Sequence, residues 1–378
     1  MSQSKQLLFT QQEYDQRVAA VRTHMRARGI DVLLIDQTEF LAYLTGFSIS
    51  ENMYRACLLP LEGEPVMVLR AVDLGPFLEN SWVSDAVAFS DWEDPVEVLA
   101  TTLARRGWDT LAIGIDEDSY CMPLRRFRQV SARVPQARFV DFSGVLERLR
   151  LRKSPAEVAY LREASRIADL ALAAVVAEAG PGRSERDAAA VVHRVFMEQG
   201  ADTSRAGIIT AGVGDSFLHG NLHGTPLRTG DVLHLELLPL VNGYSARLMR
   251  PVVIGAAGER AALARQLVDI QDRQFAAMAP GRKASEVDAI AREGVLAAGL
   301  RDDYRNITGY TIGHFPLSTP HTSDFSRIFL PTSDWVLEPG MVFHMYVSAA
   351  GVAFSETVLV TDDGIECLTK APRKLFEA

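Results

Sequence analysis

Residues 232–254 read VLHLELLPLVNGYSARLMRPVVI, and this stretch decides how the second half of the chain folds. Two apolar runs flank Asn242-Gly243, a pair typical of the tight turn between antiparallel strands. Because alternate side chains of a strand share one face, His234 and Glu236 point the same way. If Glu236 faces a cleft, the strand register sets Arg247 beside it, which predicts a carboxylate–guanidinium ion pair.

The same helix-then-hairpin pattern occurs a second time. A helix expected from Ser184 to about Gly200 precedes residues 232–254, and one capped near Ser285 and closed near Gly299 precedes a second hairpin. That hairpin comprises 341–348 and 352–361, with a turn near Gly351. Two such halves bury their apolar faces by packing together, so we expect a pseudo-twofold α+β domain over residues 151–378 with a cleft along its seam.

Residues 1–150 follow a different pattern and are expected to form an α/β domain. A helix is capped by Thr10 and Glu13 and ends at Gly29, and apolar strand-like runs follow it, with helical patterns between them. These runs are 31–35, 57–60, 66–69 and 111–115. A new helix then begins at Ser154-Pro155-Ala156-Glu157, which has a cap serine, a proline in the first turn and the glutamate of a capping box. The domain boundary is therefore placed near residue 150.

Composition excludes several classes of function. The chain has 378 residues, 48% of them hydrophobic, with 39 Lys and Arg against 48 Asp and Glu for a net charge of -9. That charge repels phosphate backbones, so nucleic acid is not an expected partner. No apolar stretch is long enough to cross a bilayer, no targeting signal is recognised, and Cys57, Cys121 and Cys367 lie far apart, so a cytoplasmic protein without membrane contact is expected.

Histidines concentrate in the proposed second domain. Six of the eight lie between residues 219 and 344, and histidine is the side chain best suited to proton transfer near neutral pH. His219 and His223 have the spacing of a helical zinc site, but Gly220, Gly224 and Pro226 disfavour a helix there. His219 on a glycine-rich loop is better placed to reach into a cleft as an acid or base.

Three phrases resemble the pita-bread hydrolases, the family of creatinase, prolidase, aminopeptidase P and methionine aminopeptidase. They are Leu44-Thr45-Gly46-Phe47, residues 152–157 with the letters RKSPAE, and residues 337–343 with the letters LEPGMVF. The resemblance implies a creatinase-like domain over 1–150 and a pita-bread catalytic domain over 151–378. It also implies a homodimer in which the partner's N-terminal domain completes the active site.

The metallopeptidases of that family hold two metals, and the resemblance places their five ligand positions on this chain. Those positions fall on Glu236, Arg247, Tyr310, Tyr346, and Ser355 or its neighbour Glu356. A guanidinium among the ligands repels dications, which prefer several anionic oxygens. The expectation is therefore no metal and no cofactor.

The chain is more similar to creatinase, the metal-independent branch. The creatinase catalytic histidine falls on His219, which implies a proton shuttle between water and the departing nitrogen. The creatinase glutamates that hold a guanidinium fall on Met249 and Tyr346, so creatine itself is a poor candidate substrate. Arg55 and Arg327 are candidate counterparts of the arginines that bind the creatine carboxylate.

The sequence therefore predicts a metal-independent hydrolase that cleaves a C–N bond of a small polar metabolite. The bond is an amidine, cyclic amidine, amide or ureido group, with a lyase reaction as an alternative, and Arg247 suggests a substrate carboxylate. His219 is the predicted general base and acid, and Glu236, Arg247 and Glu356 orient or polarise the substrate. The other candidate contacts, several of them possible second proton carriers, are Arg55, His223, His234, Tyr310, His314, His321, Arg327, His344 and Tyr346.

Two alternatives stay open at this point. One is a metallohydrolase with altered ligands, such as an Xaa-Pro peptidase, with one zinc or iron held by His219, His234, Glu236, His321 and His344. The other is a pita-bread protein that binds a ligand without catalysis.

Overall fold

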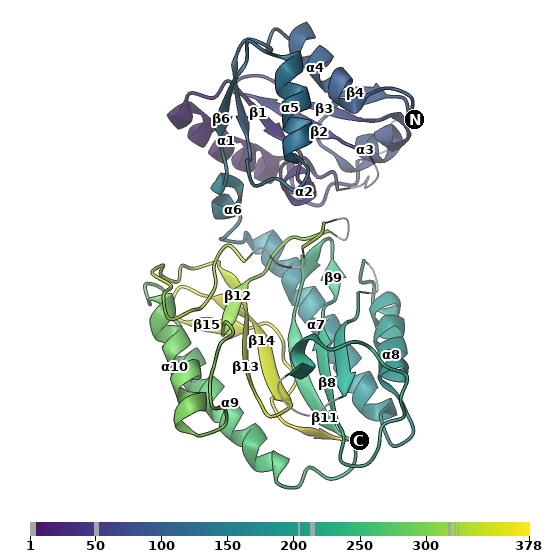
Figure 1. Cartoon of the computed structure of the whole chain (residues 1–378), viewed down its shortest axis with the longest axis vertical. Helices are drawn as coiled ribbons and strands as arrows, with labels where there is room; N and C mark the ends of the chain where they lie inside the picture. The colour runs from purple at the N-terminus through teal and green to yellow at the C-terminus, as the bar shows by residue number, and fades with distance from the viewer. Residues whose placement is uncertain are drawn as a thin grey trace. The chain divides into compact units, whose positions relative to one another are not determined.

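The structure is a computed structural model that describes residues 5–48, 53–202, 205–211, 216–316, 319–321, 323 and 325–378. The chain divides into two compact units (Figure 1). One comprises residues 1–150 with 316–320, and the other comprises 151–315 with 321–378.

The first unit is an α/β domain around one six-stranded sheet with the order β4-β3-β2-β1-β5-β6. Its strands are β1 (Val32–Ile35), β2 (Ala56–Pro60), β3 (Val66–Arg70), β4 (Asp85–Phe89), β5 (Ala112–Ile115) and β6 (Arg138–Asp141). Its helices are α1 (Gln11–Arg28), α2 (Thr38–Thr45), the 3₁₀ turn η1 (Ala71–Asp73), α3 (Leu74–Asn80), α4 (Pro95–Arg105), α5 (Leu124–Arg133) and α6 (Val145–Leu149). The expected strands are confirmed, while β4 and β6 were not predicted.

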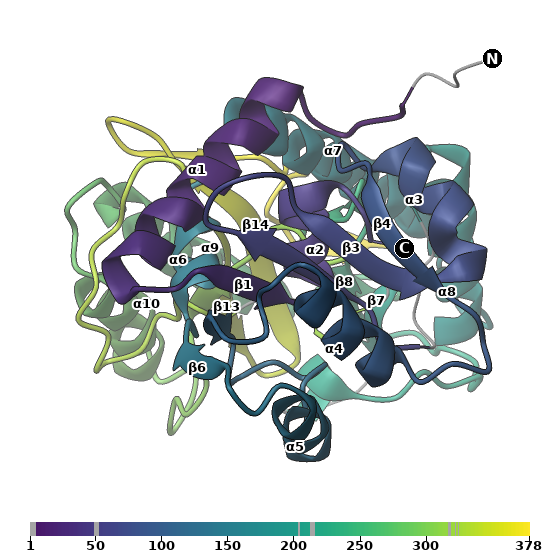
Figure 2. The same cartoon turned by 90° about the horizontal axis from the view of Figure 1, so that it is seen from above.

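Both faces of this sheet are covered, which explains the nearly continuous apolar strands. Helices α1, α2 and α6 pack on the face that carries Leu33 and Ile35, and α4 and α5 pack on the face that carries Val32 and Leu34. Figure 2 shows α1 and α5 on opposite sides of the strands. Helix α1 begins after the cap Thr10 and ends at Gly29, which takes the left-handed conformation, as the sequence predicts.

The second unit is an α+β domain around an eight-stranded sheet. Its main path runs β12-β13-β14-β11-β8-β7, with β15 beside β14 and β16 beside β11. These strands are β7 (Gly207–Ala211), β8 (Val232–Leu237), β11 (Leu248–Val253), β12 (Gly309–Thr311), β13 (Val342–Ala349), β14 (Val352–Val360), β15 (Ile365–Cys367) and β16 (Phe376–Glu377). The remaining elements are α7 (Pro155–Glu178), α8 (Glu185–Glu198), η2 (Ser216–His219), β9 (Leu240–Val241), β10 (Tyr244–Ser245), α9 (Arg260–Ala277) and α10 (Ala284–Ala297).

The predicted repeat is present in this unit. Two helices followed by strands occur twice, and the two halves meet where β11 pairs with β14. The capping box at Ser154 and Glu157 begins α7 as expected. The helix expected to be capped near Ser285 begins at Ala284, with Lys283 at the N-cap position and without a side-chain cap hydrogen bond.

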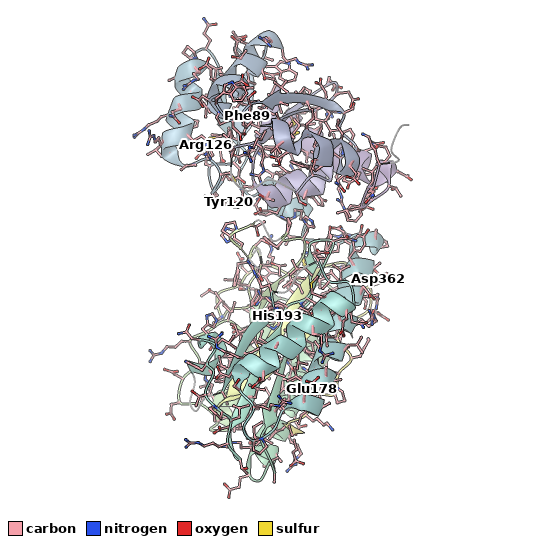
Figure 3. The ribbon with its side chains drawn as sticks, turned by 90° about the vertical axis from the view of Figure 1, so that its right-hand side faces the viewer. Phe89, Tyr120, Arg126, Glu178, His193 and Asp362 are labelled. Atoms are coloured by element: carbon pink, nitrogen blue, oxygen red, sulfur yellow. The ribbon has the colours of Figure 1, made fainter. Side chains whose placement is uncertain are left out.

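One face of the eight-stranded sheet is covered by helices. Helices α7 and α8 pack on leucines of β8, and α9 and α10 pack on residues of β13 and β14 such as Val347 and Phe354. Figure 3 shows helices packed against the strands, with His193 on α8 and Glu178 at the end of α7. Because side chains alternate, the other face is left for the polar residues of the same strands.

None of the helices within the described residues is long and apolar enough to span a membrane.

Candidate active site

A row of four side chains crosses the face of the sheet opposite the helices. Glu236 of β8 pairs with Met249 of β11, Met249 with Ser355 of β14, and Ser355 with Tyr346 of β13. Cross-strand partners point to the same face, so these positions, distant in sequence, form one surface. They include three of the positions at which the metallopeptidase resemblance places metal ligands.

A cavity of about 610 Å³ lies against this row. Its lining comprises Arg205, Gly207, Ile208, Leu218, His219, Glu236, Leu238, Arg247, Met249, Asn306, Ile307, Tyr310, Phe325 and Tyr346. The volume falls in the usual range for small-molecule sites, and polar groups project among apolar walls, as such sites require.

The predicted ion pair lies at this cavity. Arg247 Nη1 donates to Glu236 Oε1 over 2.6 Å, and the two residues are only 6% and 2% exposed. The Arg247 guanidinium also lies 5.4 Å from the centroid of the Tyr310 ring. The expectation that register sets Arg247 beside Glu236 is therefore confirmed.

Two tyrosines place neutral hydroxyl groups in the cavity. Burial is the main cause that raises the pKa of Tyr310, and it raises the pKa of Tyr346 to about 12. The Tyr346 hydroxyl accepts a hydrogen bond of 3.3 Å from Asn306 Nδ2. Both phenols keep their protons near neutral pH, so they can donate hydrogen bonds but do not supply anionic ligands.

His219 reaches the same cavity from the end of η2 and is exposed there. The Thr210 hydroxyl of β7 donates to the Phe217 carbonyl over 2.8 Å, which ties η2 to the sheet. At Gly220, an added Cβ would approach Thr210 Cγ2 to 2.7 Å, so a glycine is needed for this close approach. The glycine-containing loop that the sequence predicts therefore places the His219 imidazole at the cavity.

His234 and His344 lie on the same face of the sheet as Glu236 and Tyr346, but they are buried and are absent from the described cavity lining. Burial lowers the pKa of His234 to about 3 and the pKa of His344 well below its usual range. His234 packs edge-on against Phe217, and His344 stacks on Tyr346. Within the described residues their ring nitrogens have no hydrogen-bond partner. They are neutral packing groups in this conformation, and their assignment as substrate contacts stays a prediction.

The other predicted side chains lie elsewhere. His223 is exposed, with Nδ1 3.2 Å from Glu185 Oε2, and residues 220–224 are not helical. His314 packs on Tyr244, with ring centroids 5.0 Å apart. Arg327 donates to the Ser326 carbonyl over 2.9 Å.

Two further predicted contacts are untested by the cavity. His321 is exposed and is not part of the described lining. Arg55 belongs to the first unit, where its guanidinium donates to the Thr38 hydroxyl. A role for either residue in substrate binding stays a prediction.

Glu356 requires a correction. Its carboxylate is 2.5 Å from Arg250 Nη2 and accepts from the Thr369 hydroxyl, on the helix-covered side of the sheet. Its neighbour Ser355 points to the cavity face, in the row that contains Glu236. The position implied on the cavity face is therefore occupied by Ser355, which is buried in the sheet and accepts from Met249 N–H over 2.7 Å, and Glu356 is no longer a catalytic candidate.

Sequence reasoning missed Arg205, Asn306 and Phe325. Arg205 precedes β7, and Asn306 lies in the segment before β12, where neither periodicity nor a motif marks them. Phe325 stacks on Tyr310 with ring centroids 4.5 Å apart and has a positive φ of 49°, which is unusual for an aromatic residue. Backbone strain of this kind concentrates at functional sites.

The cavity residues do not fit a dinuclear metal centre. At the five implied positions stand one carboxylate, which is paired with a guanidinium, two protonated phenols and a serine hydroxyl. Two dications need several anionic oxygens, and Arg247 adds a positive charge. Over the described part of the chain, no three His, Cys, Asp or Glu side chains gather closely enough to hold a metal.

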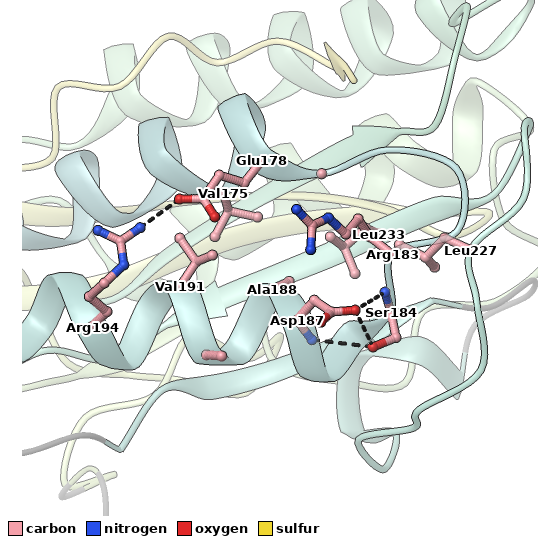
Figure 4. A pocket seen from close by; sticks show the side chains of 12 residues that line it. Val175, Glu178, Arg183, Ser184, Asp187, Ala188, Val191, Arg194, Leu227 and Leu233 are labelled. Atoms are coloured by element: carbon pink, nitrogen blue, oxygen red, sulfur yellow. Dashed lines mark hydrogen bonds and ion pairs between the residues drawn. The ribbon is translucent and has the colours of Figure 1, made fainter.

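A second, smaller cavity of about 290 Å³ lies between α7 and α8 (Figure 4). Four of its polar residues form two pairs: Arg194 donates to Glu178 over 2.5 Å, and the Ser184 hydroxyl donates to Asp187 over 2.8 Å. No histidine is found among the described residues that line it. The larger cavity is therefore the candidate active site.

Comparison with known families accounts for almost the whole chain. Residues 159–362 match the model of metallopeptidase family M24, and residues 17–152 match the creatinase/prolidase N-terminal domain. The chain therefore belongs to the M24 family and combines a creatinase-type N-terminal domain with a pita-bread domain. The predicted family and fold class are confirmed.

Individual relatives span nearly all of the chain. It is 28% identical to ectoine hydrolase of Halomonas elongata, over 98% of each chain. It is 29% identical to the Xaa-Pro dipeptidase of Pyrococcus furiosus, over 77% of this chain and 80% of the relative. The structure matches a prolidase from Thermococcus sibiricus with a TM-score of 0.84 at 23% identity, over 97% and 99% of the two chains.

Proposed function

We propose that the protein is a metal-independent hydrolase that cleaves a C–N bond of a small metabolite bearing a carboxylate. The named relatives are a hydrolase and a dipeptidase, which supports hydrolysis as the reaction class. The observation that carries the rest is the Arg247–Glu236 pair at the cavity, where a metallopeptidase needs anionic ligands. The Arg247 guanidinium lies 2.6 Å from that carboxylate, so a fixed side chain supplies the positive charge that a metal ion would otherwise supply.

The similarity to ectoine hydrolase supports the C–N bond of a cyclic amidine as the bond that is cleaved. Ectoine is a cyclic amidine that carries a carboxylate, and it is small enough for a cavity of about 610 Å³. We therefore propose compounds of this chemical class as substrates.

His219 carries the proton transfers in this proposal. It removes a proton from water, the oxygen adds to the amidine carbon, and the same imidazolium returns the proton to the nitrogen as the C–N bond breaks. The products are an amide and a free amine, so water is the only co-reactant. General acid–base catalysis of this kind is worth about 10²- to 10⁴-fold.

The surrounding groups would orient the amidine. Glu236 accepts hydrogen bonds, so it can bind the N–H groups of a planar amidinium, while Arg247 holds the carboxylate in place by donating to Oε1. The hydroxyls of Tyr310 and Tyr346 can donate to the oxygen that develops negative charge on the attacked carbon.

The test compares His219→Gln with His223→Gln. Both residues are exposed histidines of one loop region, but only His219 lines the cavity. With ectoine as substrate we expect His219→Gln to lose about 10²-fold or more in kcat, and His223→Gln to stay within about threefold of the parent.

Metal analysis distinguishes the competing function. We expect protein purified without a histidine tag to contain substoichiometric metal, and its turnover of ectoine to survive chelators. Stoichiometric metal with cleavage of Xaa-Pro dipeptides would contradict the proposal and favour a metallopeptidase. Binding of ectoine with no turnover in the parent protein would favour a non-catalytic binding protein.

We also propose that the protein is a homodimer in which Arg55 of one subunit completes the site of its partner. We expect a dimeric mass by light scattering, and a higher KM in Arg55→Gln without loss of the dimer. A monomer with full activity would contradict this part of the proposal.

A further inference from the structure

Arg205 is the cavity cation that the mechanism does not use. Four residues of the described lining can carry charge: Arg205, His219, Glu236 and Arg247. Glu236 and Arg247 neutralise each other at 2.6 Å. The described residues include no ion-pair partner for Arg205, so its charge is available to a ligand.

The backbone beside Arg205 is fixed by the sheet. The Ala206 carbonyl accepts a hydrogen bond of 3.2 Å from Leu238 N–H, and Gly207 pairs with Leu237 of β8. Gly207 has a φ of 109°, and a Cβ there would lie 1.8 Å from the Glu236 carbonyl oxygen, so only glycine fits. This close approach holds the residue before Ala206 at the cavity edge, next to the strand that carries Glu236.

Apolar side chains also line the cavity. Ile208 lies opposite Glu236 on the neighbouring strand, and Leu238 and Met249 add further apolar surface. A ligand that matches this lining combines a polar reacting group for His219 and Glu236 with an apolar part and an anionic group for Arg205. Arg247 already donates to Glu236, so we assign the substrate carboxylate to Arg205, and the expected carboxylate contact of Arg247 stays a prediction.

We propose that Arg205 binds the carboxylate of the substrate and thereby selects carboxylate-bearing cyclic amidines over their neutral counterparts. This inference rests on the proposed hydrolysis of such a metabolite. Guanidinium groups bind carboxylates through two parallel hydrogen bonds, which a lysine reproduces only in part.

The test pairs two ligands with three variants. The ligands are ectoine and its carboxamide, which keeps the ring and removes the charge. The variants are Arg205→Gln, Arg205→Lys and the control Arg265→Gln, which changes an exposed arginine of α9 outside the cavity lining. Dissociation constants from calorimetry and kcat and KM are measured for each.

We expect Arg205→Gln to weaken ectoine binding about 10- to 100-fold, mainly through KM, and to leave the carboxamide within about threefold. Arg205→Lys should fall between, and Arg265→Gln should match the parent. Equal effects on both ligands, no effect on either, or no binding of ectoine by the parent protein would overturn the inference.

The two proposals fail in different ways. Selective binding of ectoine through Arg205 without any turnover would overturn the proposed hydrolysis and keep the carboxylate site. Turnover of both ligands with no dependence on Arg205 would keep the hydrolysis and overturn the carboxylate site.

Discussion

Two buried arginine–glutamate pairs flank the same strand and lie on opposite faces of the sheet. Arg247 binds Glu236 at the cavity, and Arg250, three residues later, binds Glu356 on the helix-covered face. The guanidinium of Arg250 also donates to the carbonyls of Met249, Ser355, Ala371 and Pro372. Chemically similar pairs therefore do different work: Arg250 ties the C-terminal segment to the sheet, while Arg247 and Glu236 line a space that a ligand can enter.

The largest difference is expected in stability. Arg250→Met removes the nearer cation of the buried Glu356, whose other cation, Arg373, lies 3.6 Å away, and should cost about 3–5 kcal/mol in the free energy of unfolding. Arg247→Met should cost about 1–3 kcal/mol, because water can enter the cavity and solvate Glu236. Urea unfolding measures both.

The control for that prediction removes both charges on the helix-covered face. Arg250→Met combined with Glu356→Leu should recover part of the loss, since no unpaired charge remains in the core. Equal losses for Arg247→Met and Arg250→Met would break the comparison.

Activity should respond in the opposite order. Glu236→Gln is expected to lower kcat about 10²-fold or more, because a neutral amide no longer binds a cationic amidinium strongly. Glu356→Gln should keep kcat within about threefold and lower the free energy of unfolding instead. Steady-state kinetics at a temperature where both variants are folded checks this, and a loss of kcat in Glu356→Gln alone would contradict it.

Acid should affect the two faces with opposite sign. On the cavity face, burial lowers the pKa of His234 to about 3 and lowers that of His344, so the unfolded chain binds more protons below about pH 6.5. Each histidine then lowers the free energy of unfolding by up to about 1.4 kcal/mol per pH unit as the pH falls. Denaturation at pH 7.5, 6.0 and 5.0 measures the slope.

Glu356 supplies the contrast in the same experiment. Burial raises its pKa, so the stability that it contributes is present at low pH and is lost as the pH rises through the raised value. His234→Phe should flatten the acid slope, whereas Glu356→Gln should make it steeper. An unchanged slope in His234→Phe would show that this imidazole is solvated in solution.

The smallest effects are expected at the second partners of each face. Asn306→Ala removes the hydrogen bond to the Tyr346 hydroxyl and should raise KM about three- to tenfold with little change in stability. Thr369→Val removes the hydroxyl that donates to Glu356 and should cost about 1 kcal/mol without changing KM. A loss of stability without a change in KM in Asn306→Ala would show that Asn306 supports the fold and not substrate binding.

The sequence predicted those parts of the site that strand periodicity controls. The alternation of side chains placed Glu236 and Arg247 on one face. The turn at Asn242-Gly243 set the register of the two strands, from which the ion pair was predicted. The choice between Ser355 and Glu356 was also available, because a two-residue turn that pairs Ala349 with Val352 sets Tyr346 opposite Ser355. A one-residue shift exchanges the two faces, which is why the motif alone left it open.

Loop residues of the site could not be predicted in this way. Arg205 and Asn306 enter the cavity from segments outside the strands, and their positions depend on tertiary contacts such as the close approach of Gly207 to Glu236. The burial of His234 and His344 also needed the structure, since alternation gives the face of a residue but not how deeply it is covered. Strand register is encoded locally, whereas cavity shape is set by the whole domain.

The ion pair at the cavity also limits how such a chain could change in evolution. Replacing Arg247 alone by an acid would leave two carboxylates together while Tyr310, Tyr346 and Ser355 still offer no charge to bind a metal. Each intermediate between this cavity and a dinuclear centre is electrostatically unfavourable, so several substitutions would have to arise together. Lineages that acquire this pair are thereby expected to keep it while their substrates diversify.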